Sequence, residues 1–425
     1  MSCCSWMSRC GVLLALVLAA SVAGVVGGWL LPASVRGAGE PAAVKAAPSA
    51  DWSQWLGPDR TGISTETGWR TDWAAKPPKT LWKASVGVGY SSVSVAHGRL
   101  YTMGNAGGKD TVFCLNAAKG TEVWKHSYHC EAGEQPGTRC TPTVDGDSVY
   151  TLSREGDLFC LSAESGKVKW QVNVKTFGAA VQQWGFACSP LVLDKRLILD
   201  LGPTVALAKD TGELVWKSGS DKAGYSSPIA FKEGDATHLA VFNEFGLGIL
   251  DAADGKSLAR ARWETKYGVN PVTPIVRGNR FFISSGYDRG CALMELADGN
   301  LKTVWENKNL RTHTGTSMLV GDSLYGFDGQ MDQGALTCVD FATGEKKWTQ
   351  ADIKAGSLMA ADGKLIIITA KGDLIIAAAS PDGYKELART KALTGQCWTM
   401  PVLAGGRIYG RSHEGDLVCL DVRGK

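Results

Sequence analysis

Short apolar and polar runs separated by glycine turns recur along the chain and predict β-strands throughout. Residues 147–170, DSVYTLSREGDLFCLSAESGKVKW, are typical. They predict two strands joined by a turn at 155–157, then a second turn ending at Gly166 and a third strand ending at Trp170. Glycine is favoured in such turns because a tight hairpin needs a positive φ, which a side chain penalises. The pattern predicts an all-β fold.

The glycine of the second turn repeats at intervals of 39–46 residues, which is the length of one four-stranded propeller blade. The aligned glycines are Gly120, Gly166, Gly212, Gly255, Gly299, Gly344, Gly383 and Gly424. A tryptophan follows the glycine in five copies, as Trp124, Trp170, Trp216, Trp305 and Trp348. Ala259 and Leu387 replace it in two others. A position that tolerates replacement suits packing better than catalysis, so we expect these indoles to join neighbouring blades.

Two incomplete copies predict that the blades close into a ring. The last copy, DLVCLDVRGK, has no outer strand with a tryptophan, whereas residues 78–86, PKTLWKASV, supply such a strand without the strands that should precede it. Closure removes the exposed ends of an open array. We therefore expect the strand at 78–86 to complete the last blade beside Cys419, which gives an eight-bladed β-propeller over residues 51–425.

Residues 1–37 predict export. Arg9 precedes an unbroken apolar run at 11–31, and small residues follow it. A run of 21 residues is also long enough to span a bilayer, so a cleaved signal peptide and an N-terminal membrane anchor both stay open. Residues 38–50 predict a linker.

Charge and motifs exclude several function classes. The formal net charge is only +3, so no long-range field favours nucleic acid or anionic lipid. The sequence shows no Ser/His/Asp ordering, no phosphate-binding loop and no dinucleotide fingerprint.

The repeated A-x-x-G-x-x-x-W pattern, seen in LNAAKGTEVW, LSAESGKVKW and VDFATGEKKW, resembles the tryptophan-docking repeat of the quinoprotein-type (PQQ-binding-like) β-propellers. This family includes PQQ-dependent alcohol dehydrogenases and the assembly protein BamB. The stretch DWSQWLGPDRTGIS, at 51–64, is similar to the opening motif of exported members, except that Leu56 stands where arginine is usual. The resemblance implies that each tryptophan packs near the glycine turn of a neighbouring blade.

The resemblance also implies what a quinoprotein dehydrogenase would need. In those enzymes PQQ lies over the propeller axis, a disulfide between adjacent cysteines covers it, and Glu, Asn and Asp hold Ca²⁺. The adjacent cysteines of this chain, Cys3 and Cys4, precede the apolar run and cannot reach such a site. The chain also lacks the long insertions that build a lid and a calcium cage. We expect no catalytic, cofactor-binding or metal-binding residues, and neither PQQ nor calcium.

The first strand of each blade should line the central channel, as in the family. Its opening residues supply our candidates for a binding rim that could hold a peptide or a small ligand. They are Tyr90, Arg139, Trp184, Tyr225, Asn270, His313 and Trp398. The alternative is that the hydroxyls of these segments bind water in the channel mouth while the aromatic side chains cap the core.

Cys130 and Cys140 bracket the loop CEAGEQPGTRC, and an exported protein permits a disulfide between them. A zinc site that adds His126 and His129 is the alternative, although its spacing matches no standard finger.

Together these features predict a non-enzymatic, exported scaffold of the periplasm or cell envelope, similar to BamB. We expect a monomeric propeller that binds envelope proteins or extended polypeptides. No cysteine follows the apolar run at a lipobox position, so acylation is not expected. A PQQ-dependent dehydrogenase, or a degenerate relative that binds PQQ without turnover, stays open as the alternative. Binding of sugars by the aromatic rim stays open as well.

Overall fold

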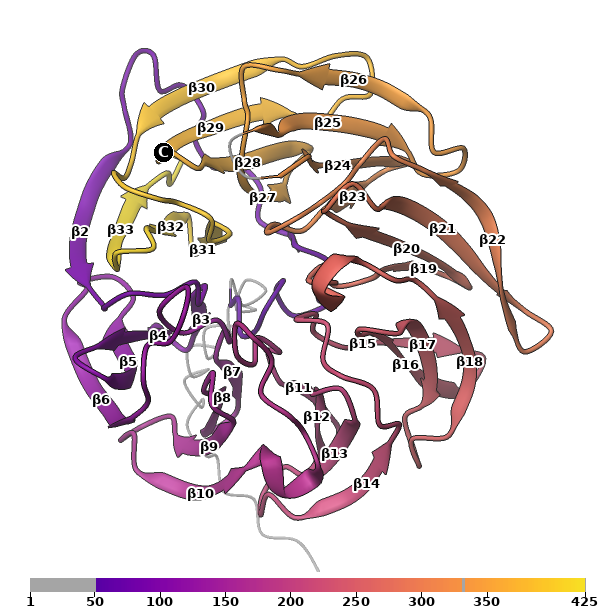
Figure 1. Ribbon diagram of the computed structural model, residues 1–425. Helices are drawn as coiled ribbons and strands as arrows, with labels where there is room; N and C mark the ends of the chain where they lie inside the picture. The colour runs from indigo at the N-terminus through magenta and orange to yellow at the C-terminus, as the bar shows by residue number, and fades with distance from the viewer. Residues whose placement is uncertain (1–50, 331–332, 425) are drawn as a thin grey trace, which may run out of the picture. The chain divides into compact units, whose positions relative to one another are not determined.

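Eight sheets stand around a central channel in the computed structural model, which describes residues 51–330 and 333–424 (Figure 1). We number the blades in chain order and count with each blade the loop that leads into its first strand. Within a blade the first strand lies nearest the channel and the last lies at the circumference (Figure 1). The predicted eight-bladed propeller is confirmed. The predicted export segment at 1–37 and linker at 38–50 lie outside the described residues.

Short apolar runs and glycine turns give every blade four antiparallel strands, which are consecutive in blades 1 to 7; in blade 8, β2 supplies the fourth strand. Blades 1 and 2 contain β3 (Ser94–Ala96), β4 (Arg99–Ala106), β5 (Lys109–Asn116), β6 (Glu122–His129), β7 (Thr143–Asp145), β8 (Ser148–Leu152), β9 (Asp157–Ser162) and β10 (Val168–Asn173). Blades 3 and 4 contain β11 (Leu191–Leu193), β12 (Arg196–Asp200), β13 (Thr204–Ala208), β14 (Leu214–Ser218), β15 (Ile229–Glu233), β16 (Ala236–Phe242), β17 (Gly246–Asp251) and β18 (Ser257–Arg262). Blades 5 and 6 contain β19 (Ile275–Arg277), β20 (Arg280–Ser285), β21 (Gly290–Ala297), β22 (Asn300–Asn307), β23 (Met318–Val320), β24 (Ser323–Asp328), β25 (Ala335–Asp340) and β26 (Lys346–Gln350). Blades 7 and 8 contain β27 (Gly356–Ala361), β28 (Lys364–Thr369), β29 (Asp373–Ala378), β30 (Glu386–Lys391), β31 (Val402–Ala404), β32 (Arg407–Arg411) and β33 (Asp416–Asp421).

The ring closes as the sequence predicts. Strand β2 (Lys79–Ser85) forms the outer strand of blade 8 by pairing antiparallel with β33, and Trp82 stands opposite Cys419. A further strand, β1 (Ile63–Ser64), joins blade 7 by pairing parallel with β27. The N-terminal part of the described chain therefore belongs to the last two blades.

The described residues contain little helix. Two short 3-10 helices, η1 (Val174–Phe177) and η2 (Lys266–Gly268), lie in connections between blades. No helix within residues 51–330 and 333–424 has the length and hydrophobicity needed to cross a membrane.

Each docking tryptophan wedges its blade against the next one. Trp124 illustrates the geometry, because its indole N–H donates to the Ala163 carbonyl of blade 2 at 2.9 Å. A Cβ atom added to Gly166 would lie 2.6 Å from the same indole ring. The same indole-to-carbonyl bond from one blade to the next is made by Trp82, Trp170, Trp216, Trp305 and Trp348. The aligned glycine thus supplies both a positive φ and the space that the indole fills.

Blade 4 provides an internal control for this contact, because Ala259 takes the place of the tryptophan. No atom lies within 4 Å of the position that a Cβ on Gly299 would occupy. Gly166 and Gly299 have nearly the same backbone φ, 70° and 73°. Gly299 lies in the two-residue turn between Ala297 and Asn300, and no indole packs against it.

We expect Gly166→Ala to destabilise the protein by about 2 kcal/mol more than Gly299→Ala. Both variants carry the cost of a left-handed alanine, roughly 1–2 kcal/mol, but only the first forces a methyl group into the Trp124 ring, which costs about 1–3 kcal/mol. Chemical denaturation of the two variants measures the difference. Equal losses of stability would contradict the docking role of the glycine.

Candidate functional site

The stretch DWSQWLGPDRTGIS and the two residues after it form a segment, residues 51–66, that crosses the channel and that we call the plug. Figure 1 shows this part of the chain, in indigo, inside the ring. Its hydrogen bonds, strand pairing and side-chain packing reach every blade. The residues that it contacts are, from blade 1 to blade 8, Val95, Val144, Ser189, Pro228, Thr273, Met318, Ala360 and Gly405. A segment held by all eight blades closes the channel at its own level.

Arg60 pins the plug to blades 3 and 4. Its guanidinium donates to the carbonyls of Pro228 at 2.8 Å and Ser189 at 3.2 Å, and also to the carbonyl of Pro190. Its Nε donates to the Gln54 side chain at 3.0 Å. Arg60 is 3% exposed. Burial lowers the pKa of Arg60 to about 10, so the side chain is still charged at neutral pH.

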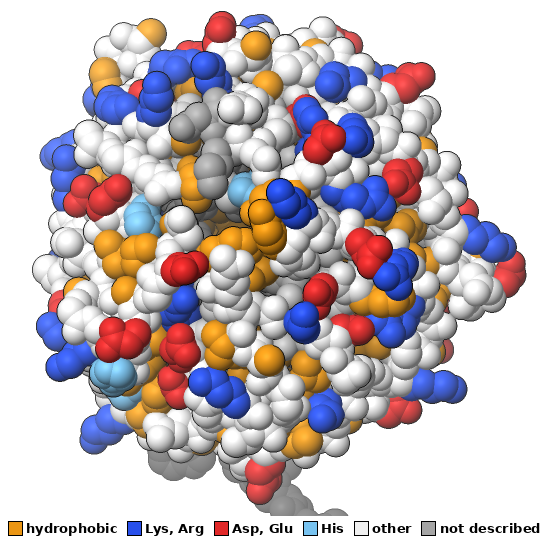
Figure 2. Space-filling view, viewed as in Figure 1, with side chains coloured by type: hydrophobic (Ala, Val, Ile, Leu, Met, Phe, Trp, Pro, Cys, Tyr) orange, Lys and Arg blue, Asp and Glu red, His pale blue; other side chains and the backbone are white. Residues whose placement is uncertain are grey.

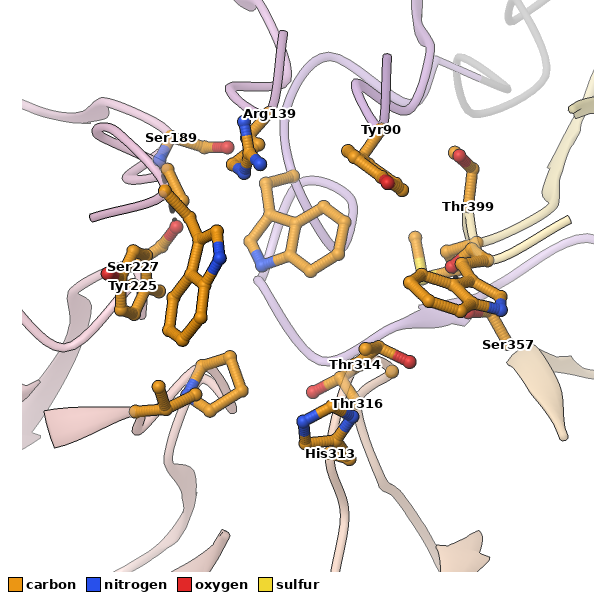
Figure 3. A pocket seen from close by; sticks show the side chains of 18 of the residues that line it. Tyr90, Arg139, Ser189, Tyr225, Ser227, His313, Thr314, Thr316, Ser357 and Thr399 are labelled. Atoms are coloured by element: carbon orange, nitrogen blue, oxygen red, sulfur yellow. Dashed lines mark hydrogen bonds between the residues drawn. The ribbon is translucent and has the colours of Figure 1, made fainter. Parts of the chain in front are cut away.

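A cavity of about 270 Å³ lies over the plug, and Trp55 of the plug forms part of its lining. Most of the wall comes from the segments that lead into the first strands of the blades, and Figure 3 shows the lining side chains around the cavity. Six of the seven predicted rim residues line it: Tyr90, Arg139, Trp184, Tyr225, His313 and Trp398. The plug therefore forms the floor of the cavity.

The seventh predicted rim residue, Asn270, was placed wrongly. It is fully buried, and its side-chain amide donates to the carbonyls of Asn243 and Trp263 at 2.8 and 3.3 Å. Its side-chain oxygen accepts a hydrogen bond from the Ser285 hydroxyl at 2.7 Å. Asn270 therefore joins blades 4 and 5, and its chain neighbours Val269 and Pro271 line the cavity instead.

Aromatic side chains surround the mouth of the cavity in two runs of ring contacts, which we call the collar. The first run contains Trp184, Tyr225, Tyr267, Tyr287 and His313, and the second contains Trp398, Tyr90 and His413. Neighbouring ring centroids in the collar lie between 4.6 Å and 6.2 Å apart. Figure 2 shows hydrophobic side chains gathered around a hollow near the centre of this face.

Three collar tyrosines hold a backbone conformation that favours glycine. Tyr225, Tyr267 and Tyr287 have φ values of 76°, 66° and 53°. A non-glycine residue in this region costs roughly 1–2 kcal/mol, and such strain concentrates at functional sites. Tyr267 is also 60% exposed, an unusual setting for a large aromatic side chain. The chain holds these rings at the mouth at a cost in stability.

The cavity wall carries one cationic side chain among neutral ones and has no acidic group among its described residues. Among the described residues that line it, none is Asp or Glu, and Arg139 is the one Lys or Arg. The Arg139 guanidinium donates to the carbonyls of Gly137 at 2.9 Å and Gln135 at 2.7 Å, and it lies over the Tyr90 ring. Burial lowers the pKa of Arg139 to about 10, so it stays charged at neutral pH. Burial also lowers the pKa of His313 below its usual range, which favours the neutral ring.

The expected disulfide between Cys130 and Cys140 is not formed, because both cysteines are free thiols. Cys140 accepts a hydrogen bond from the Leu152 amide of blade 2 and is part of a buried apolar cluster, whereas Cys130 directly follows β6, the outer strand of blade 1. The Cys130 amide donates to the Gly108 carbonyl of blade 1, and the loop between the two cysteines does not bring their thiols together. Within the described residues, no group of three or more His, Cys, Asp or Glu side chains is placed to hold a metal ion.

Sequence reasoning missed the plug, two collar tyrosines and part of the cavity wall. Trp55 and Arg60 were seen only as parts of a motif, although two tryptophans and an arginine within ten residues are an unusual cluster outside the repeat. Tyr267 and Tyr287 each adjoin a glycine in a connecting loop, a signal that a search for loop aromatics could have used.

Comparison with known proteins identifies the family. The family model described as outer membrane protein assembly factor BamB matches residues 109–350, more than half of the chain. The chain belongs to the BamB family. The BamB of Burkholderia pseudomallei is 24% identical over 268 residues, which cover 58% of this chain and 63% of that protein. This chain spans less than two thirds of the length of the curated relatives that it matches.

Solved structures support the same fold at low identity. The crystal structure of BamB from Moraxella catarrhalis aligns with a TM-score of 0.60 and 16% identity, covering 81% of this chain and 97% of that one. A quinohemoprotein alcohol dehydrogenase from Comamonas testosteroni aligns with a TM-score of 0.66 and 14% identity, covering 89% of this chain and 82% of that one. BamB and a dehydrogenase align about equally well with this chain. These similarities therefore establish the propeller fold, and the function has to be inferred from the residues of the site.

Proposed function

We propose that this BamB-family protein is a non-enzymatic, exported propeller of the cell envelope that binds extended polypeptides or partner proteins at the collar. The observation that carries the proposal is the set of three tyrosines with positive φ at the mouth of a cavity closed at its other end. The strained backbone presents aromatic rings to the outside, which stability alone does not require. A role in ligand binding would explain why the three tyrosines are held in this strained conformation.

The chemistry of the collar favours polypeptide over a large cofactor. Tyrosine and tryptophan are enriched in protein interfaces because they combine large apolar area with a polar atom and lose little conformational entropy. A cavity of about 270 Å³ is slightly smaller than typical small-molecule pockets of roughly 300–1,000 Å³. A chain lying across the collar could insert one side chain or one chain end into it. The names of the matched relatives, outer membrane protein assembly factors, agree in kind with an envelope partner.

A PQQ-dependent dehydrogenase is the second candidate, because quinoprotein dehydrogenases share the fold. The residues of the cavity do not fit that cofactor and its calcium ion. Ca²⁺ prefers carboxylate and carbonyl oxygens, and the described lining residues include no carboxylate. A tricarboxylate would find a single guanidinium, that of Arg139. We therefore derive no step through a quinone.

A photocrosslinker at the collar tests the proposal. We expect a benzoyl-phenylalanine at position 267 to form reproducible adducts with envelope polypeptides, because the Tyr267 side chain is 60% exposed at the collar. The adducts are identified by mass spectrometry. The matched control carries the same group at Val168, which is exposed on the outer strand β10 of blade 2.

The double variant Trp184→Ala and Tyr287→Ala should remove the adducts at position 267, because it deletes two of the rings that neighbour Tyr267. Adducts that are the same from positions 267 and 168, or that persist in the double variant, would contradict binding at the collar.

A further inference from the structure

The cavity contains a partly buried cation, Arg139, without an acidic partner among the described lining residues. Both hydrogen bonds of the Arg139 guanidinium go to carbonyls of its own loop, those of Gly137 and Gln135. The lining residues that the structure describes offer no carboxylate to it. A guanidinium prefers to bind a carboxylate in a planar, two-bonded geometry. Arg139 therefore has unused capacity for an anion in the cavity.

A second group of polar atoms lacks partners on the wall across from Arg139. The hydroxyls of Thr316 and Thr399 and the Nδ1 atom of His313 are buried and make no hydrogen bond. Thr316 and Thr399 are only 5% and 4% exposed. Figure 3 shows Thr316 and His313 across the cavity from Arg139, with Thr399 on a third side. Buried polar groups in proteins usually have a hydrogen-bond partner, so these three atoms can bond to a ligand in the cavity.

The remaining lining combines six aromatic rings with small, apolar and hydroxyl-bearing side chains. Trp55, Trp184 and Trp398 contribute indole rings, and the cavity is small for a ligand site. Indole rings favour planar or compact apolar groups. A ligand that matches this wall is therefore short and apolar in its middle and charged at one end.

We infer that the cavity binds a carboxylate carried on a compact apolar or planar group. The carboxylate pairs with Arg139, the apolar group packs against the indoles, and Thr316 and Thr399 bond to polar atoms of the ligand. Two sources supply this chemistry: the C-terminal end of a polypeptide whose last residue is apolar, or a small free acid. The polypeptide source deepens the proposed function and rests on it.

Calorimetric titration with defined probes tests the inference on the purified protein. The probes are the acetylated tetrapeptide Gly-Ser-Gly-Phe with a free C-terminal acid, the same peptide with a C-terminal amide, and phenylpropionate. We expect the acid peptide to bind at least tenfold more tightly than the amide peptide, because only the acid can pair with the guanidinium.

Three variants separate the role of Arg139 from a general effect on the fold. Arg139→Gln should weaken binding of the acid peptide by about 10- to 100-fold and leave the amide peptide unchanged. Arg139→Lys keeps the charge and should recover part of that loss. Arg262→Gln is the matched control, because Arg262 is exposed and lies on the outer strand β18. Thermal unfolding confirms that each variant is folded.

Each outcome decides one part of the inference. Preference for the acid peptide that depends on Arg139 supports it with the polypeptide source. Phenylpropionate binding as tightly as the peptide supports the carboxylate site and overturns the polypeptide source. Equal binding of acid and amide peptides, no effect of Arg139→Gln, or no binding of any probe overturns it. If crosslinking from position 267 persists in that case, the inference fails and the proposed function stands. If crosslinking also fails, both fall.

Discussion

Replacing Arg411 by methionine is expected to lower the free energy of unfolding by about 3 kcal/mol. Arg411 lies in β32 of blade 8, is 1% exposed, and carries its guanidinium into blade 1. There it donates to the Ser91 carbonyl at 3.0 Å, the Met103 carbonyl at 2.6 Å, the Gly87 carbonyl at 2.9 Å and the Thr102 hydroxyl at 3.1 Å. Each buried acceptor left without a donor costs roughly 1–3 kcal/mol, and removing the buried charge offsets part of that sum.

Denaturant unfolding measures the Arg411 effect, with Arg423→Met as the control. Arg423 is half-exposed and pairs with Asp421 on the surface, so its loss should change stability by no more than about 0.5 kcal/mol. Arg411 is charged at neutral pH, since burial lowers its pKa only to about 9. If Arg411→Met were as stable as Arg423→Met, blade 8 would not be fastened to blade 1 in the way described.

Arg60→Met is expected to cost about 3 kcal/mol as well and to loosen the plug selectively. The variant leaves the carbonyls of Pro228, Ser189 and Pro190 without their donor in a buried setting. Hydrogen exchange should become faster for the amides of Gly57 and Gly62, which bond within the plug.

The outer strands of the blades serve as the internal reference for the exchange rates of Arg60→Met. Amides of the outer strands β6 and β10 should exchange at the wild-type rate, because their ladders do not include the plug. Uniform acceleration over the whole ring would show that the arginine acts on global stability alone. An unchanged plug would show that Arg60 does not hold it.

The ring could be predicted because the residues that define a blade lie close together in sequence and recur in successive copies. Each copy carries its own turn glycine, and five of the eight also carry the tryptophan, so the seven spacings between the glycines all indicate the same blade length. Closure could also be predicted, since the unpaired strand at 78–86 matched the unpaired end of the last copy. Strand β2 and Trp82 occupy that place.

The plug could not be predicted, because its contacts are distant in sequence and do not repeat. Arg60 reaches carbonyls 129, 130 and 168 residues away, and no periodic pattern encodes such pairs. Arg411 was equally hidden, since an arginine beside a glycine turn reads as a surface residue. Both side chains are buried because backbone carbonyls of other blades satisfy them.

The errors at the site have the same origin. Asn270 lies in a segment that leads into an inner strand, and sequence alternation does not tell whether its side chain faces the channel or the next blade. Cys130 and Cys140 are close in sequence, but the Cys130 amide bonds to blade 1, whereas the Cys140 thiol accepts a hydrogen bond from Leu152 of blade 2. Tyr267 lies in the connection between blades 4 and 5 and Tyr287 in the turn between β20 and β21, where their backbone φ values reveal an unusual role.

Hydrogen–deuterium exchange of the protein with and without the polypeptide captured through position 267 tests the central claim most directly. If the polypeptide binds at the mouth of the plugged cavity, exchange should slow in the collar loops at 182–186, 265–269 and 286–289. The outer strands β10 and β14 should be unaffected. Protection confined to those outer strands, with unchanged exchange in the collar loops, would contradict the account.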